Sequence, residues 1–143
     1  MKNKKKLLRM LDANLNRSRE GLRVLEDFFR FISETNTLRS KARKIRHAME
    51  KLISEKSLIK TMFKERNSKS DLGKEVDLWE MKREEIFDLV YANFQRVKES
   101  TRVIEELLKI IDKRKVKLIK NIRYEIYNME KKTFEKWTYL CGS

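Results

Sequence analysis

ANLNRSREGLRVLEDFFRFI, residues 13–32, reappears as ANFQRVKESTRVIEELLKII at residues 92–111, and the two stretches align without a gap at an offset of 79 residues. Eight of the twenty aligned pairs are identical, and five of these eight are polar. The five polar pairs are Asn14/Asn93, Arg17/Arg96, Glu20/Glu99, Arg23/Arg102 and Glu26/Glu105. A duplicated helix needs only its apolar pattern to pack, so the repeated polar residues require a separate explanation.

The repeat also predicts the architecture. Apolar residues recur at helical spacing in both copies, and the chain has no proline and only three glycines, so it lacks the turns that a sheet protein needs. An Ile-Arg pair follows each copy, at residues 45–46 and 122–123, with an offset of 77 that a two-residue change in the turn would explain. We therefore expect an all-α bundle of two pseudo-twofold-related helical hairpins, with about five helices and no sheet.

The expected elements fill most of the chain. Apolar periodicity and cap residues predict helices over 7–32, 38–55, 58–65, 81–111 and 113–137, with a loop at 66–78. A length of 143 residues fits one domain, covering 1–143, whose internal repeats are 7–55 and 81–137, linked by 56–80.

The charge of the chain favours an anionic partner. There are 36 Lys and Arg residues against 22 Asp and Glu, a net charge of +14. Nucleic acid, acidic lipid and phosphorylated metabolites would all be attracted. One cysteine excludes an internal disulfide, and no apolar run approaches the length of a membrane span. We expect a cytoplasmic protein without a membrane partner, and a homo-oligomer because long apolar helices in a small chain favour a dimer.

Some of the repeated polar residues fall on the apolar face of a helical wheel. These are Asn14, Arg17, Asn93 and Arg96. Gly21 and Ser100 lie one turn further along the same side, and their small size predicts a gap beside each Asn/Arg pair. An arginine that faces a core must meet an acid, a carbonyl, water or an anionic ligand. The guanidinium and amide groups suit phosphate or a pyrimidine edge.

Acids could also satisfy these arginines. Glu20 and Glu99 lie three residues after them and could pair with them, or bind a metal. Arg46 and Arg123, in the second helix of each hairpin, could reach the same clefts or remain solvated. Both interpretations stay open at this point.

The loop SKSDLGKE, residues 68–75, contains further candidates. Asp71 could bind a metal, Gly73 would allow close approach of the backbone, and Lys74 could contact phosphate. The loop is not a P-loop, because it lacks the spaced glycines followed by Lys-Ser/Thr.

The doubled pattern N-x-x-R-x-x-E-x-x-R-V-x-E, the IRH and IRY helices and the linking R-x4-D-L-G (Arg66, Asp71, Gly73) resemble a known family. It is the small all-helical hydroxymethylpyrimidine-phosphate kinase family of thiamin synthesis, which occurs alone or fused in front of thiamin-phosphate synthase. The resemblance covers nearly the whole chain. The glycine-rich barrel of the synthase has no counterpart here.

The resemblance implies that the chain is an enzyme that phosphorylates hydroxymethylpyrimidine phosphate to the pyrophosphate, with ATP and Mg2+. Arg17, Arg96, Arg46 and Arg123 would then hold phosphates, and Asn14 and Asn93 would orient them or the pyrimidine. Thiamin-phosphate synthase would be a partner. Two other functions remain open, a basic helical module that binds nucleic acid and a non-catalytic partner domain of the synthase.

Overall fold

The computed structural model describes residues 2–53 and 85–138. Helix α1 (Lys2–Asp27) continues as a π-helix (Phe28–Ile32), and α2 (Asn36–Glu50) ends in a 3-10 turn (Lys51–Ile53). Helix α4 (Ile86–Ile111) is followed by a 3-10 turn (Lys113–Lys115) and α5 (Val116–Glu135). The described residues contain no strand, so the all-α prediction is confirmed.

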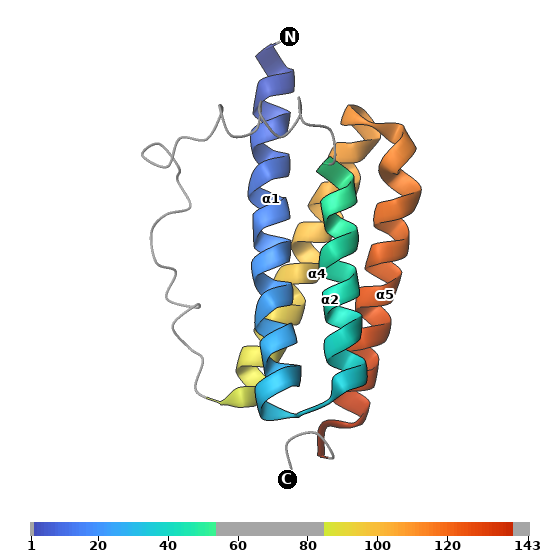
Figure 1. The fold of residues 1–143 in the computed structure, drawn as a ribbon. Coiled ribbons are helices and arrows are strands. Elements are labelled where there is room, and N and C mark those ends of the chain that lie inside the picture. The colour runs from blue at the N-terminus through green and yellow to red at the C-terminus, as the bar shows by residue number, and fades with distance from the viewer. Residues whose placement is uncertain (1, 54–84, 139–143) are drawn as a thin grey trace.

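The four described α-helices form two antiparallel hairpins, α1 with α2 and α4 with α5 (Figure 1). Helix α1 makes its most extensive contact with α4, and α2 packs against α5. Chain direction reverses between α1 and α4, which places the two sequence repeats side by side and antiparallel (Figure 1). A twofold axis perpendicular to these two helices relates the repeats.

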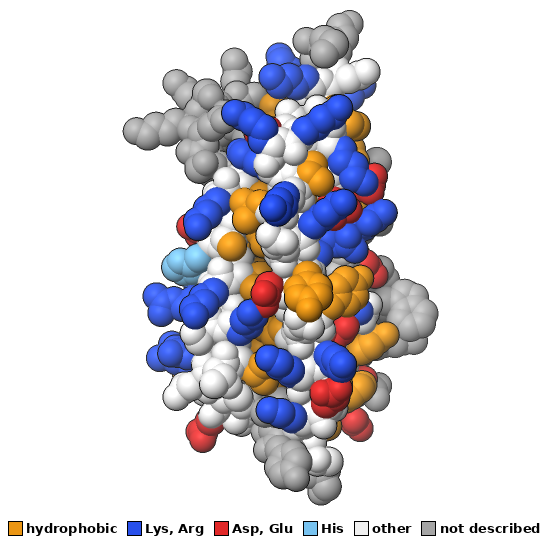
Figure 2. All heavy atoms as spheres, turned by 90° about the vertical axis from the view of Figure 1, so that its right-hand side faces the viewer, with side chains coloured by type: hydrophobic (Ala, Val, Ile, Leu, Met, Phe, Trp, Pro, Cys, Tyr) orange, Lys and Arg blue, Asp and Glu red, His pale blue; other side chains and the backbone are white. Residues whose placement is uncertain are grey.

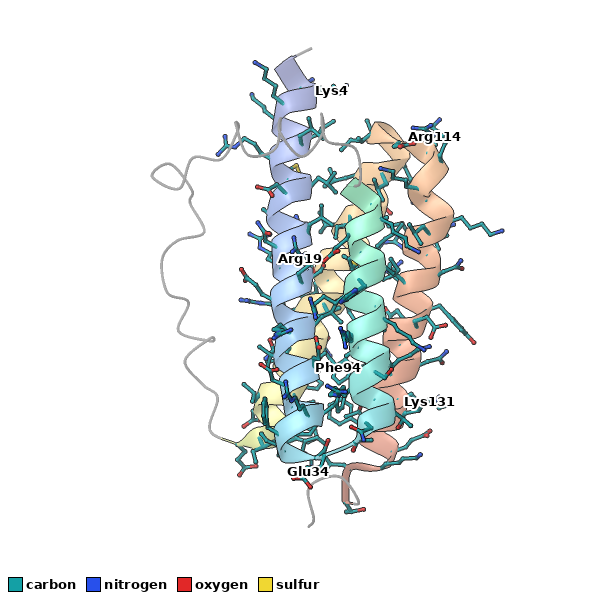
Figure 3. All side chains as sticks on the ribbon, viewed as in Figure 1. Lys4, Arg19, Glu34, Phe94, Arg114 and Lys131 are labelled. Carbon is teal, nitrogen blue, oxygen red and sulfur yellow. The ribbon has the colours of Figure 1, made fainter. Side chains whose placement is uncertain are left out.

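Corresponding positions of the two hairpins build one core. Along α1 with its π-helical end, and along α4, the buried equivalent pairs include Leu11/Val90, Leu15/Phe94, Leu25/Ile104 and Phe29/Leu108. Along α2 and α5 they include Ala42/Ile119, Ile45/Ile122 and Met49/Ile126. Each fully buried side chain of this kind stabilises the fold by about 1.5–3 kcal/mol relative to an exposed one. Phe94 points into the interior, whereas Lys4 and Lys131 extend away from the bundle (Figure 3).

The turns of the two hairpins differ in length, as the change of offset predicted. Residues 33–35 separate the first pair of helices, whereas only Asp112 separates Ile111 from Lys113. In the longer turn Glu34 has φ of 51°, in the left-handed region that non-glycine residues seldom adopt. In the shorter turn the side chain of Asp112 accepts a hydrogen bond from the backbone N–H of Arg114 at 3.1 Å.

Several predicted boundaries need correction. The first helix begins at Lys2 instead of residue 7, and α4 begins at Ile86 instead of residue 81, because Glu85 has an extended backbone (φ −128°, ψ 159°). Ile32 ends the apolar periodicity of the first copy, yet it is 44% exposed because the π-helix turns the last residues of that copy away from the α-helical register. The predicted helix at 58–65 and the loop at 66–78 lie outside the described residues, and the single domain over 1–143 stays a prediction.

Candidate functional site

The centre of the α1/α4 contact is built from small residues. The hydroxyl oxygens of Ser18 and Ser100 are hydrogen-bonded at 2.6 Å, and a Cβ atom added to Gly21 would lie only 2.7 Å from Cγ2 of Val97. At an offset of 79, Ser18 corresponds to Val97 and Gly21 to Ser100. The contact between Ser18 and Ser100 and the contact between Val97 and Gly21 are therefore equivalent under the symmetry of the repeat.

The predicted gap beside Gly21 and Ser100 is absent, so that prediction is wrong. Ser100 is only 3% exposed, and its hydroxyl also donates to the carbonyl oxygen of Arg96 at 2.6 Å. The small residues allow the backbones of α1 and α4 to approach closely, and Val97 fills the space that a side chain at Gly21 would occupy. A ligand cannot enter between the helices at this level.

The repeated asparagines make the same contact in both halves. Nδ2 of Asn14 donates to the carbonyl oxygen of Met10 at 2.8 Å, and Nδ2 of Asn93 donates to that of Leu89, also at 2.8 Å. Oδ1 of Asn14 accepts a long hydrogen bond from Arg17 at 3.4 Å. Each asparagine side chain thus donates to a backbone carbonyl oxygen of its own helix, and its amide oxygen remains the group that accepts hydrogen bonds from other side chains.

The repeated arginines lie at the outer edge of the α1/α4 contact. Arg17 is exposed, and a guanidinium nitrogen of Arg96 lies 4.0 Å from a carboxylate oxygen of Glu20 on the other helix. The expectation that Arg17 faces the core is wrong, because its long side chain extends outward from the margin of the apolar face. Glu20 and Glu99 are also exposed. None of these positions tests the predicted phosphate-binding or metal-binding roles.

Two buried glutamates each hold one hairpin together, whereas the three-residue spacing of Arg23 and Glu26, and of Arg102 and Glu105, predicted only surface ion pairs. Glu26 is 7% exposed and accepts from Nε of Arg46 at 2.9 Å. Its counterpart Glu105 is 2% exposed and accepts from Arg123 at 3.3 Å and from Arg102 at 3.1 Å. The identity of the two glutamates in the repeat, with the Ile-Arg pair that follows each copy, was the available signal.

The contacts of these two glutamates place Arg46 and Arg123 apart from most of the other predicted site residues. Asn14, Arg17, Asn93 and Arg96 belong to the α1/α4 contact, whereas Arg46 lies between α1 and α2 and Arg123 between α4 and α5. The structure therefore divides most of the predicted set, although it brings Glu99 and Arg123 together in one groove between α4 and α5. Gly73, Lys74 and Asp71 lie outside the described residues.

The described residues hold no cluster of three or more His, Cys, Asp or Glu side chains that could bind a metal ion by themselves. Mg2+ in phosphoryl-transfer sites is usually bound by one or two carboxylates together with substrate phosphates. Glu20 and Glu99, being exposed, fit that kind of site.

A cationic groove of about 460 Å³ lies between α4 and α5, and we call it the basic groove. It is lined by Gln95, Lys98, Glu99, Arg102, Arg123 and Tyr127. Nζ of Lys98 lies 3.0 Å from a carboxylate oxygen of Glu130, and Arg102 contacts Glu105 and Glu106. Three cations from two helices thus converge on one opening.

Two carboxyl groups near the α4/α5 turn have shifted acidity. A hydrogen bond from Lys109, followed by its charge, lowers the pKa of Glu106. A hydrogen bond from the side chain of Arg114 is the main cause that lowers the pKa of Asp112. Both groups favour the ionised form, so neither is suited to act as a general acid.

Lys and Arg side chains spread over the face of the bundle where α5 lies, with few acidic ones between them (Figure 2). Across residues 2–53 and 85–138, every helix is too short or too polar to span a membrane.

Comparison with known proteins identifies relatives over most of the chain. The model of the ThiD2 family matches residues 9–132. The chain belongs to the ThiD2 family. The earlier resemblance to a thiamin-biosynthesis family is thereby confirmed, whereas the kinase activity stays a prediction.

Curated relatives of this ThiD2 chain include thiamine-phosphate synthases of cyanobacteria. The Synechocystis protein is 34% identical over 87% of this chain and 35% of its own length, and the Thermosynechococcus vestitus protein is 35% identical over 87% of this chain and 34% of its own length. The protein of Nostoc punctiforme is 34% identical over 85% of this chain. The chain thus spans about a third of the length of these relatives. No solved structure matches it.

Proposed function

We propose that this chain is a phosphotransferase of thiamin biosynthesis that phosphorylates hydroxymethylpyrimidine phosphate to the pyrophosphate with ATP. The bond between the γ-phosphorus and the β,γ-bridging oxygen of ATP breaks. A bond forms between that phosphorus and a phosphate oxygen of the pyrimidine substrate, and ADP leaves with the bonding electron pair.

The basic groove is the observation that carries this proposal. Phosphoryl transfer needs little covalent chemistry from the protein, but it needs positioning and positive charge around the transferred group. Lys98, Arg102 and Arg123 supply such charge around a groove of about 460 Å³. In a chain of a thiamin-biosynthesis family, a phosphorylated small molecule is the anion that suits this groove best.

The reaction does not require a strong general base. The second pKa of a phosphate monoester is about 6, so the attacking oxygen is already largely ionised near neutral pH. The requirement falls instead on bringing two anionic substrates together. This suits a basic bundle whose net charge is +14.

The α1/α4 residues supply the second part of the proposed site. Among the repeated polar residues, Glu26 and Glu105 are explained by buried structural contacts. Arg17 and Glu20 are exposed, and Glu20 lies 4.0 Å from Arg96 in an exposed, long ion pair. Their repetition is therefore better explained by a ligand, and we assign Arg17 and Arg96 to the pyrimidine phosphate. Glu20 or Glu99 would hold Mg2+, which supplies charge neutralisation at the phosphates.

The remaining sequence candidates keep smaller roles in this proposal. Asn14 and Asn93 would orient the substrate through their amide oxygens. Arg46 and Arg123 would contact substrate phosphates while they remain bound to Glu26 and Glu105. Asp71, Gly73 and Lys74 stay candidates for metal and phosphate contacts.

One alternative is favoured by a specific observation. The chain corresponds to about a third of thiamine-phosphate synthase relatives, so it could serve as a non-catalytic partner domain of such a synthase. The net charge of +14 keeps a nucleic-acid-binding module as the other alternative.

The test is an assay with the purified chain, hydroxymethylpyrimidine phosphate and MgATP, with and without added thiamin-phosphate synthase, in which ADP and the pyrimidine pyrophosphate are both measured directly. We expect ADP and pyrimidine pyrophosphate to form in equal amounts. Arg17→Ala and Arg96→Ala should each lower kcat/KM roughly 10- to 150-fold, because a charge-assisted hydrogen bond contributes about 1.5–3 kcal/mol.

Arg43→Ala is the matched control, since Arg43 is an exposed arginine of α2 outside the proposed site. It should retain the turnover of the unaltered chain. No ADP formation by the unaltered chain, even with the synthase present, would favour the partner-domain alternative. Tight RNA binding that weakens steeply with salt would favour the nucleic-acid alternative.

A further inference from the structure

A second groove adjoins the basic groove along the same two helices, and we call it the aromatic groove. It has a volume of about 670 Å³ and its walls include Phe87, Tyr91, Phe134 and Trp137. Gln95 and Lys98 line both grooves, so the two are neighbours along α4 and α5, and we call the pair the channel.

The aromatic walls leave ring surface open. Phe87 and Tyr91 stack with centroids 6.2 Å apart at an interplanar angle of 8°, and Phe134 packs against Phe87 at 5.2 Å and Trp137 at 5.7 Å. Yet Phe87 is 42% exposed and Tyr91 is 50% exposed. A flat heteroaromatic ring can stack on such a surface, and every nucleobase presents a suitable π-face.

The first hairpin lacks aromatic side chains at the described positions equivalent to Phe87 and Tyr91. The positions that correspond to Phe87 and Tyr91 are Leu8 and Asp12, which are 2% and 7% exposed. The position that corresponds to Lys98 is Arg19, so the first hairpin keeps the positive charge at this position but not the aromatic side chains. The second hairpin alone therefore combines an open aromatic wall with cations.

The dimensions of the channel suit an extended nucleotide. Tyr91 and Arg102 are eleven residues apart on α4, about 16 Å along the axis at 1.5 Å per residue. Lys98 lies between them and donates to Glu130, and Arg102 is 56% exposed and contacts Glu105 and Glu106. A lysine has three N–H donors and an arginine five, so each keeps donors beyond those contacts. A ring at one end, cations at the other and a bridging lysine match a base joined to a phosphate chain.

We propose that this channel binds the nucleoside triphosphate, with its base against Phe87 and Tyr91 and its phosphates near Lys98 and Arg102. This inference rests on the proposed kinase function and adds the location of its nucleotide site. It also assigns the nucleotide to one of the two pseudo-equivalent hairpins. The pyrimidine substrate remains at the α1/α4 face.

The first test measures binding of a non-hydrolysable ATP analogue with Mg2+ to the full chain. Tyr91→Ala and Phe87→Ala should each weaken binding roughly 5- to 150-fold, the loss expected when one base–aromatic contact is removed. Tyr124→Ala is the control for the aromatic wall, because Tyr124 is an exposed tyrosine of α5 that lines neither groove. Lys98→Ala should also weaken binding, whereas Arg19→Ala, at the equivalent position of the first hairpin, should not.

The outcomes separate this inference from the proposed function. Unchanged analogue binding by Tyr91→Ala and Lys98→Ala, in a protein that still forms pyrimidine pyrophosphate, would overturn the nucleotide site and leave the kinase standing. The nucleotide site would also be overturned if Tyr91→Ala and Lys98→Ala weakened binding of the pyrimidine monophosphate and left binding of the ATP analogue unchanged. Binding of the analogue in the channel by a protein that shows no turnover would leave the site standing and refute the kinase.

A second measurement needs no variant and so does not depend on how the variants fold. Photo-crosslinking of 8-azido-ATP to the unaltered chain should label peptides from α4 and α5. Labels confined to α1 and α2 would overturn the proposal.

Discussion

The two hairpins share their polar contacts but differ in their outer grooves. Asn14 and Asn93 make identical hydrogen bonds, and Glu26 and Glu105 each bind an arginine of the following helix. In contrast, Leu8 is buried where Phe87 is exposed. The comparison teaches that the equivalent contacts of Glu26 and Glu105 serve the fold in both halves, whereas the difference in the grooves points to where the nucleotide binds.

The largest expected effect concerns the buried glutamates. Glu105→Ala should lower the free energy of unfolding by about 3–5 kcal/mol, because it leaves the largely buried Arg123 without its carboxylate. Glu26→Ala should cost less, about 1–3 kcal/mol, because Glu26 is less buried and Arg23 lies 3.8 Å away, compared with 3.1 Å for Arg102. Urea unfolding of the full chain measures both values.

Glu106→Ala is the matched control for these two variants, since Glu106 is a half-exposed neighbour on the same helix. An exposed pair of this kind should contribute little to the free energy of unfolding, because solvent screens it. A cost for Glu26→Ala equal to that for Glu105→Ala would show that the two networks are energetically equivalent despite their different geometry.

The next effect concerns the close approach of α1 and α4. Gly21→Ala should destabilise the protein by about 1–2 kcal/mol, because overpacking against Val97 costs about 1–3 kcal/mol and better helix propensity returns part of it. Ser100→Ala, at the equivalent position, should cost about 1 kcal/mol through the lost hydrogen bond to Ser18. Thermal unfolding distinguishes the two.

A double-mutant cycle tests the cause assigned to Gly21→Ala. The substitution should cost less in a Val97→Ala background, where the added methyl group has room. Additive costs would show that the contact with Val97 is not the source of the strain.

The smallest effect concerns the two turns. The pKa of Asp112 is lowered by the hydrogen bond from Arg114, so its stabilisation is present above the unfolded pKa and is lost as pH falls through the folded pKa. Asp112→Asn should therefore lower the melting temperature at pH 7, and the difference should shrink as pH falls below about 3.8, the ordinary pKa of an aspartate, and vanish only below the lowered folded pKa. Thr35→Val in the other turn, where the cap makes no side-chain hydrogen bond to the helix, should show no such pH dependence. A constant difference for Asp112→Asn down to pH 3 would contradict this account.

The apolar pattern made the bundle predictable from the sequence. Leu11, Phe29 and Phe94 are buried as the helical wheel indicates, since burial on a helix depends on a local period. The roles of Glu26 and Gly21 were not predictable in the same way. The partner of Glu26 lies twenty residues along the chain, and a small residue such as Gly21 can leave a gap or permit close packing. Only the tertiary arrangement distinguishes these outcomes.

The antiparallel contact through Ser18 and Ser100 has the form of an isologous dimer interface, in which one patch meets its own copy. In a true homodimer every substitution occurs twice, so both equivalent surfaces must change together. Joining the two copies in one polypeptide removes that constraint. Leu8 and Phe87, or Asp12 and Tyr91, could then diverge independently, so that gene duplication turned a symmetric scaffold into one with two specialised sides.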